Sequence, residues 1–172
     1  QKKRSKMRKR FARVRVDLRN VEKVTVRQYF LDGEAYFRKT HAIGGVDELD
    51  IALIEPDHTW TVEIDDYAKY EPFTEQIEIP FDANAPGLCI VNVTDDVNEA
   101  TTLVVRSDLD LVMRSSRREL LVYVQDMRQT KPAAGVPILV SDGRRILASG
   151  ETGPDGVLRR ALAELAHRDD LR

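Results

Sequence analysis

The sequence predicts an all-β fold, arranged as two small immunoglobulin- or fibronectin-like β-sandwich domains in tandem, the second of them incomplete. Apolar residues recur at every second position, as they do in half-buried strands. The runs are short, and Gly, Pro, Asn and Asp separate them. Of the 172 residues, 42% are apolar, which is enough for one mid-sized core or two small ones.

In the first domain the alternation begins at Val14 and Val16 and returns at Val24 and Val26. Residues 24–31 run into Asp32-Gly33, a pair that supplies the positive φ angles of a tight hairpin, so we expect a returning antiparallel strand at 35–40. Turn-forming residues separate the further strands expected in this domain, which are 51–54, 59–64, 75–79, 88–93 and 101–106.

The second domain follows almost without a linker, because the alternation barely pauses at Ser107-Asp108. We therefore expect a basic lead-in at 1–12, one sandwich at 13–107 and another at 108–172. At about 65 residues the second is shorter than the roughly 100 of a complete immunoglobulin sandwich. Its apolar spacing turns helical from Leu158 onwards, which predicts a turn or two of helix. Its expected strands are 109–113, 119–126, 136–140, 145–149 and 157–160.

The chain starts without Met, at Gln1, on a basic run that reaches Arg10. We expect an excised piece of a longer protein. The run is interpreted as a solvated tail or an extended lead-in to the first strand, and contact with a membrane surface or nucleic acid is the alternative. It has no apolar segment after it, so it does not resemble a signal peptide.

Overall charge and hydropathy exclude several classes of protein. The net charge of −2 gives no general attraction for nucleic acid, although the ends are basic and the middle is acidic. The longest apolar stretches, such as 88–91, fall far short of the roughly 20 residues of a membrane-spanning helix. With one cysteine, Cys89, the chain can form no internal disulfide and depends on packing.

Residues with catalytic or metal-binding potential do not form a recognisable set. His41, His58 and His167 are far apart, without His-x-x-x-His or Cys-x-x-Cys spacing. There is no Gly-rich phosphate loop and no Gly-x-Ser-x-Gly nucleophile motif. We therefore expect no enzyme activity, no cofactor, and no catalytic, cofactor-binding or metal-binding residue.

Four features have both a structural and a functional interpretation, and we favour the structural one for each. Cys89 lies in an apolar run, which raises the pKa of a thiol, so it is expected to fill the core. The pairs Asp65-Asp66 and Asp95-Asp96 are expected to be solvated loops, with calcium binding as the alternative. Asn92-Val93-Thr94 matches a glycosylation acceptor. The aromatic group of Trp60, Tyr67, Tyr70 and Phe73 is expected in a core, with a carbohydrate or peptide groove as the alternative.

Residues 101–113, 120–126 and 130–136 resemble the junction between macroglobulin domains in bacterial α2-macroglobulin-like proteins. The family's Thr-x-x-x-Gly turn corresponds to Thr152-Gly153-Pro154-Asp155-Gly156. Upstream, residues 18–24 are similar to the start of an earlier domain of the family, and residues 86–91 are similar to the "pG-Y-v-v" strand of that domain. At the tyrosine position of this strand the sequence differs, with Leu88 and Cys89 instead. Its thioester motif Cys-Gly-Glu-Gln is absent, since Ile90 follows Cys89.

The resemblance implies macroglobulin domains that frame a protease-trapping protein active in host or cell defence, periplasmic or extracellular and anchored, if at all, outside this segment. Its partners would be other macroglobulin domains of the parent chain, and proteases, with no nucleic acid. A carbohydrate- or protein-binding module of a surface protein is the alternative function. A third is an accessory domain of a peptidase, because residues 119–160 are similar to transthyretin-type units.

Overall fold

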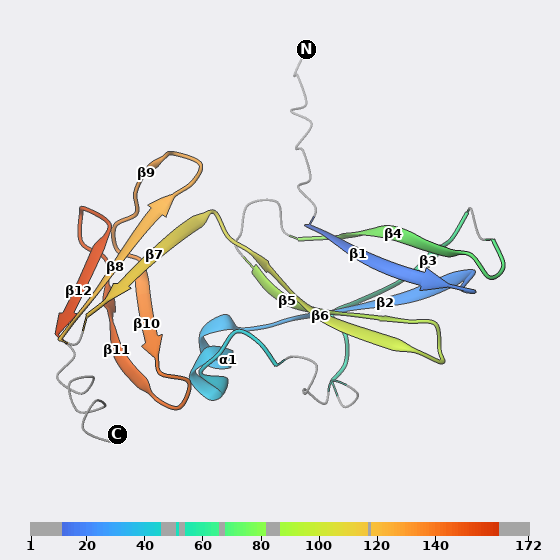
Figure 1. Cartoon of the computed structure of the whole chain (residues 1–172), viewed down its shortest axis with the longest axis horizontal. Coiled ribbons are helices and arrows are strands. Elements are labelled where there is room, and N and C mark those ends of the chain that lie inside the picture. The colour runs from blue at the N-terminus through green and yellow to red at the C-terminus, as the bar shows by residue number, and fades with distance from the viewer. Residues whose placement is uncertain are drawn as a thin grey trace, which may run out of the picture. The chain divides into compact units, whose positions relative to one another are not determined.

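The computed structural model describes residues 12–45, 51, 54–65, 68–81, 87–116 and 118–161. It confirms the all-β class, with several sheets and one short helix (Figure 1). The chain divides into two compact units. Residues 1–33 and 44–106 form the first, and residues 34–43 and 107–172 form the second.

The first unit contains a two-stranded sheet and a four-stranded sheet, both antiparallel. Strand β1 pairs with β4 from Ala12↔Ile79 to Arg19↔Pro72. The larger sheet has the order β3-β2-β5-β6. The strands of this unit are β1 (Ala12–Arg19), β2 (Lys23–Phe30), β3 (His58–Glu63), β4 (Pro72–Ile79), β5 (Gly87–Thr94) and β6 (Glu99–Arg106).

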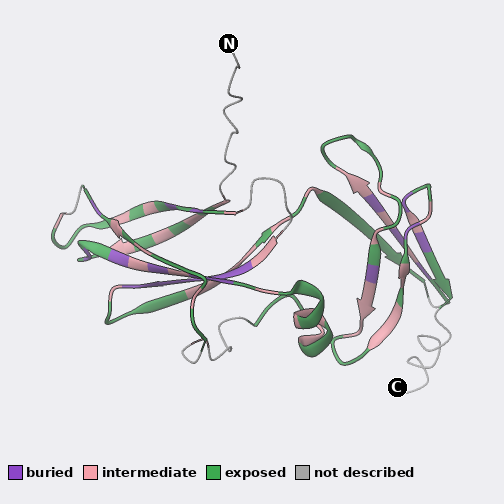
Figure 2. Ribbon diagram, turned by 180° about the vertical axis from the view of Figure 1, so that it is seen from behind, coloured by how far each residue is buried: buried purple, intermediate pink, exposed green. Residues whose placement is uncertain are grey.

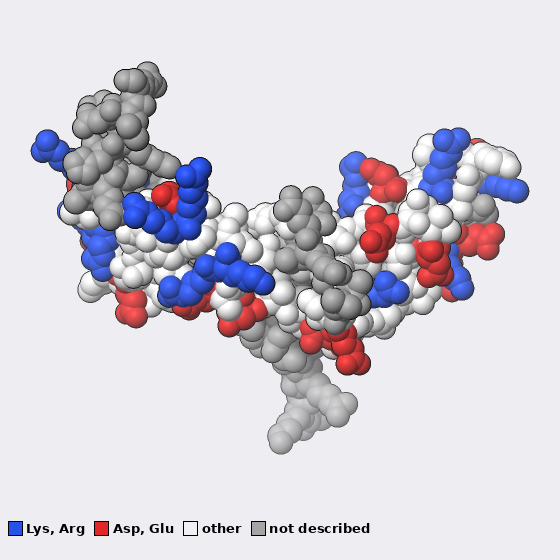
Figure 3. Space-filling view, turned by 90° about the horizontal axis from the view of Figure 1, so that it is seen from below, with Lys and Arg blue, Asp and Glu red and all other residues white. Residues whose placement is uncertain are grey.

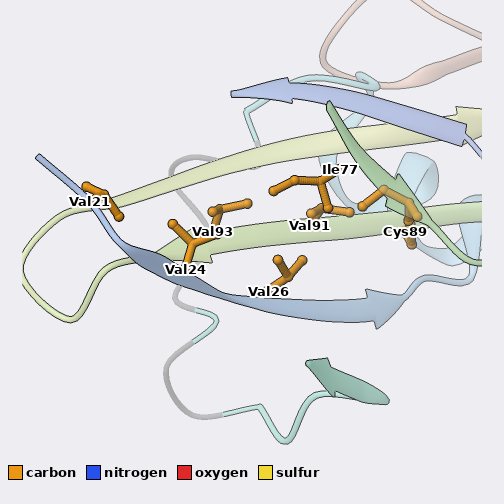
Figure 4. Packing of buried hydrophobic residues seen from close by; sticks show 8 residues of the cluster. Val21, Val24, Val26, Ile77, Cys89, Val91 and Val93 are labelled. Atoms are coloured by element: carbon orange, nitrogen blue, oxygen red, sulfur yellow. The ribbon is translucent and has the colours of Figure 1, made fainter. Parts of the chain in front are cut away.

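The core of the first unit lies between these two sheets. Alternating residues of β1 pack half-buried against it, as the period-two pattern predicts. Strand β5 is buried from Cys89 to Thr94 on both faces and has the longest apolar run. Side chains contributed mainly by β2, β4 and β5 fill the space between the sheets. The buried cluster includes Ile79, and Figure 4 labels seven further members: Val21, Val24, Val26, Ile77, Cys89, Val91 and Val93.

The predicted return strand at 35–40 is wrong, because α1 (Gly33–Thr40) occupies this segment. Its composition favours helix, and Asp32 stands at the position before it, where aspartate is a preferred residue. Arg38 pairs with Glu34 at 2.8 Å, one helical turn away. The hydroxyl of Thr40 donates to the carbonyl of Tyr36, which closes the last turn. Because this segment is a helix, β2 has no hairpin partner at 35–40 and pairs instead with β3 and β5.

The second unit has a sheet of order β12-β8-β7, extended by the short β9, and a separate β10-β11 hairpin. Leu120, Val122 and Val124 of β8 are buried together with Ile138 and Leu158. The strands are β7 (Leu109–Ser115), β8 (Glu119–Asp126), β9 (Lys131–Pro132), β10 (Pro137–Ser141), β11 (Ile146–Glu151) and β12 (Val157–Ala161).

Two further expectations differ from the structure. Instead of the strand expected at 51–54, the two described residues, Ile51 and Ile54, are joined as in a turn: the amide of Ile54 donates to the carbonyl of Ile51 at 3.1 Å. The helix expected from Leu158 is replaced at its start by β12, which pairs with β8 from Val157↔Tyr123 to Ala161↔Glu119. The rest of that expected helix, from residue 162, and the basic run lie outside the described residues.

No helix in the described part of the chain has the length and apolar character needed to cross a membrane.

Candidate functional site

The histidines do not converge. His41 follows α1 with a positive φ of 57°, and its Nδ1 is buried without a partner among the described residues. His58 begins β3, where its ring meets that of Phe30 edge-on with centroids 5.8 Å apart. His167 lies outside the described residues. Within the described ranges, no three His, Cys, Asp or Glu side chains gather in a way that could hold a metal ion.

Cys89 fills the core of the first unit and is fully buried. The Nε2 group of Gln28 donates to its Sγ at 3.4 Å and to the carbonyl of Pro80 at 2.9 Å. Burial raises the pKa of the Cys89 thiol, and the bond from Gln28 offsets only part of this effect. A thiol without solvent access and with a raised pKa is a poor nucleophile.

The acidic pair Asp95-Asp96 forms the turn between β5 and β6. One carboxylate oxygen of Asp95 accepts the backbone N–H groups of Val97 at 3.0 Å and Asn98 at 2.6 Å. These bonds, those to Asn98 first, lower the pKa of Asp95. Its oxygens thus stabilise the turn, where calcium would compete with the backbone. In the other pair Asp65 is exposed in a turn, and Asp66 lies outside the described residues.

The aromatic residues do not form one binding platform. Trp60 of β3 packs against the core of the first unit, and Phe73 of β4 is half-buried. Tyr70 is 64% exposed, and Lys69 lies over its ring with Nζ 5.3 Å from the centroid. Tyr67 lies outside the described residues.

The glycosylation match at Asn92 falls on a buried strand. Asn92 is 1% exposed, and its Nδ2 donates to the hydroxyl of Thr101 at 3.0 Å. A transferase has no access to this amide in the folded unit.

A shallow hollow opens between β1 and the β5–β6 turn. Val16, Leu18 and Val93 contribute to its apolar lining, and acidic groups stand at its rim. The rim carboxylate of Asp17 accepts a 2.6 Å hydrogen bond from Thr74, which, more than the neighbouring Arg15, lowers the pKa of Asp17. Asp17 and Asp95 are thus both engaged in the protein's own hydrogen bonds.

The Thr-x-x-x-Gly turn of the second unit has a structural role that the motif alone did not reveal. The buried hydroxyl of Thr152 donates to the carbonyl of Ala133 at 2.6 Å and accepts the N–H of Val136 at 3.0 Å. Gly156 has a φ of +72°, and a Cβ there would lie 2.6 Å from the carbonyl oxygen of Val124. Threonine and glycine are therefore required to hold this turn against β8.

The two residues between β6 and β7 are both bonded to the second unit. The hydroxyl of Ser107 accepts the N–H of Leu109 at 3.0 Å. The carbonyl of Asp108 accepts the N–H of Met127 at 2.8 Å, and its carboxylate pairs with Arg128 at 2.7 Å. The connection is therefore short, and both of its residues are held by bonds within the second unit.

Charges on the surface are mixed. On the face drawn in Figure 3, basic and acidic side chains lie beside each other over the described parts of the chain. Among the described residues several charges form ion pairs, such as Arg13–Glu78 at 3.4 Å. This face has no extended field of one sign of the kind that attracts nucleic acid.

Comparison with known proteins finds relatives both in sequence and in structure. No family model matches the sequence. The α2-macroglobulin of Ralstonia nicotianae (strain ATCC BAA-1114 / GMI1000) is 33% identical over 91 residues, which are 53% of this chain. The match spans 5% of that relative's length, so the curated protein is far longer.

The related structures are both crystal structures of native α2-macroglobulin from Escherichia coli. The one spanning domains NIE-MG1 is similar over 88% of this chain and 79% of its own, with a TM-score of 0.61 and 17% identity. The one spanning MG0-NIE-MG1 is similar over 88% of this chain and 52% of its own, with a TM-score of 0.63 and 16% identity. These similarities establish a shared fold.

Proposed function

We propose that this chain, which resembles α2-macroglobulin in sequence over 91 residues and in fold over 88% of its length, is a non-catalytic scaffold segment of a larger α2-macroglobulin-like protein. The first unit would correspond to NIE and the second to MG1, in the order in which the E. coli structure spans them. The predicted domain limits, 13–107 and 108–172, are part of this proposal.

The observation that carries the proposal is the connection between the units. Only Ser107 and Asp108 separate β6 from β7, and both are bonded to the second unit. A connection of this kind sets the spacing of the two domains, which is the task of a scaffold.

Small-angle scattering and NMR relaxation of this chain test the spacer role. A variant with four Gly and Ser residues inserted between Ser107 and Asp108 serves as the freely jointed reference. We expect the native chain to tumble as one body and the insertion variant to show two faster correlation times. If the units of the native chain moved independently, with the same correlation times as in the insertion variant, the spacer role would be contradicted.

The parent protein would trap or inhibit proteases as part of host or cell defence, in the periplasm or outside the cell. This part of the proposal is supported by the name shared by the relatives, α2-macroglobulin. It predicts other macroglobulin domains of the same chain as the partners of this segment. Co-purification of the full-length protein with an added protease, compared with a protein lacking this segment, tests the contribution of the scaffold.

Exposed Tyr70 favours a second candidate, a carbohydrate- or protein-binding module. Two alanine variants separate it from the scaffold. Trp60→Ala should lower stability, because Trp60 packs on the core, whereas Tyr70→Ala should leave the melting temperature unchanged. Glycan or peptide binding that is lost in Tyr70→Ala alone would favour the module.

A further inference from the structure

Strand β7 is an edge strand with an unusually exposed apolar sequence. It pairs with β8 on one side and, among the described residues, with no strand on the other. Figure 2 shows it exposed along its whole length. Leu111 and Met113 lie opposite the core residues Val124 and Val122, yet they are 51% and 54% exposed. An open apolar edge of this kind readily pairs with another strand.

The hydrogen bonds at both ends of the β7-β8 hairpin reveal which backbone groups are free. The N–H of Met127 donates to Asp108, and the N–H of Ser116 donates to Glu119. Because hydrogen-bonded pairs alternate along an antiparallel ladder, the even-numbered residues of β7 are the ones bonded to β8. The odd-numbered residues therefore direct their N–H and C=O groups to the free edge: Leu109, Leu111, Met113 and Ser115.

The sequence of β7 is complementary to itself when read in the opposite direction around Val112. In an antiparallel pair centred there, Leu111 faces Met113 of a second copy, and Asp110 faces Arg114 of that copy. Neither Asp110 nor Arg114 forms an ion pair within the described parts of this chain. Opposite charges directly across a strand pair are favourable, and like charges are not.

The backbone and the side chains select the same register. Centring on Val112 places odd-numbered residues opposite odd-numbered residues, so the free N–H and C=O groups of both copies meet. A shift by one residue would place them opposite groups already bonded to β8. A shift by two would place Asp110 or Arg114 opposite Val112 and lose both ion pairs.

We propose that two copies of this chain associate through the free edges of β7, in antiparallel register around Val112. The second units of the two copies then share one continuous sheet about a two-fold axis, an isologous contact. Apolar side chains pair on the inner face and ion pairs form on the outer face. This surface goes beyond the scaffold role, which makes no statement about a second copy.

Charge reversal on the full chain tests the register by sedimentation equilibrium. We expect the native chain to dimerise, and Asp110→Arg or Arg114→Asp alone to raise the dissociation constant at least tenfold, because each places like charges opposite one another. The double variant should dimerise again. An equimolar mixture of the two single variants should form a heterodimer, since both of its cross-strand pairs are of opposite charge.

A monomeric native chain across the accessible concentration range would overturn the proposal. So would single variants that dimerise as tightly as the native chain, or a mixture that stays monomeric while the native chain dimerises. Both substituted positions, Asp110 and Arg114, are exposed strand residues, and circular dichroism confirms that each variant is folded.

Disulfide capture provides an independent measurement. Val112 would meet its own copy in a non-hydrogen-bonded pair with Cα atoms about 4.5 Å apart, which is within reach of a disulfide. Val112→Cys should therefore form a covalent dimer under mild oxidation. Val105→Cys is the matched control, because Val105 is 57% exposed against 50% for Val112, and Cys89 is fully buried. Equal cross-linking of both variants, or none in either, would contradict the proposal.

Discussion

Replacement of Gly156 by alanine tests how the Thr152–Gly156 turn holds the second unit together. Gly156 has a φ of +72°, a conformation that costs a residue with a Cβ about 1–2 kcal/mol. The new Cβ would also lie 2.6 Å from the carbonyl oxygen of Val124 and 2.9 Å from Pro132 Cβ. Overpacking of this kind costs roughly 1–3 kcal/mol. We expect the free energy of unfolding of the second unit to fall by about 2–5 kcal/mol.

Gly143→Ala is the matched control, because Gly143 has a φ of +87° in the same unit and nothing within 4 Å of an added Cβ. It should cost only the conformational part, about 1–2 kcal/mol. Amide hydrogen exchange of β8 residues Leu120 to Val124, measured on the full chain, reports the stability of this unit directly. Equal losses of protection in the two variants would refute the clash with Val124.

Three further outcomes are expected. Hydrogen bonds hold the pKa of Asp95 below its ordinary 3.8, so this carboxylate stabilises the fold fully above pH 3.8 and loses its effect as the pH falls from there through the lowered pKa. Urea titrations at several pH values should show a smaller loss of stability in acid for Asp95→Asn than for the native chain. Cys89→Ser should lower the unfolding free energy by about 1–3 kcal/mol, since it buries a hydroxyl, and the native thiol should react with a disulfide reagent only after denaturation. Thr152→Val should cost about 1–3 kcal/mol in urea unfolding, because it leaves the Ala133 carbonyl and Val136 N–H without their partner.

Periodicity predicted where strands occur but not which strands pair. The alternation of β1 and the apolar run of β5 were sufficient to identify both as strands. The error at 35–40 has a specific cause: Asp32-Gly33 is compatible with a hairpin, but it also precedes a segment with a Glu34–Arg38 pair at helical spacing. The lack of apolar alternation in that segment was the feature of the sequence that argued against a strand.

The absence of a recognisable catalytic motif was readable from the sequence, but the roles of individual polar residues were not. In the sequence Asp95 is one member of an acidic pair, and only the structure shows that it accepts hydrogen bonds from the N–H groups of Val97 and Asn98. The exposure of Leu111 could not be predicted from the sequence for a similar reason. Alternation indicates a strand with one apolar face, and whether anything covers that face depends on the tertiary arrangement.

The strand pairing of the first unit also limits when it can fold during synthesis. Its earliest strand, β1, needs β4, as in the pair Ala12↔Ile79, and β2 obtains its central partner only from β5, as in Phe30↔Cys89. Because β5 supplies much of the core, an emerging chain gains little by forming the earlier strands alone. Cooperative folding of this unit must therefore wait until β5 has left the ribosome, and until then the apolar strands are available to chaperones.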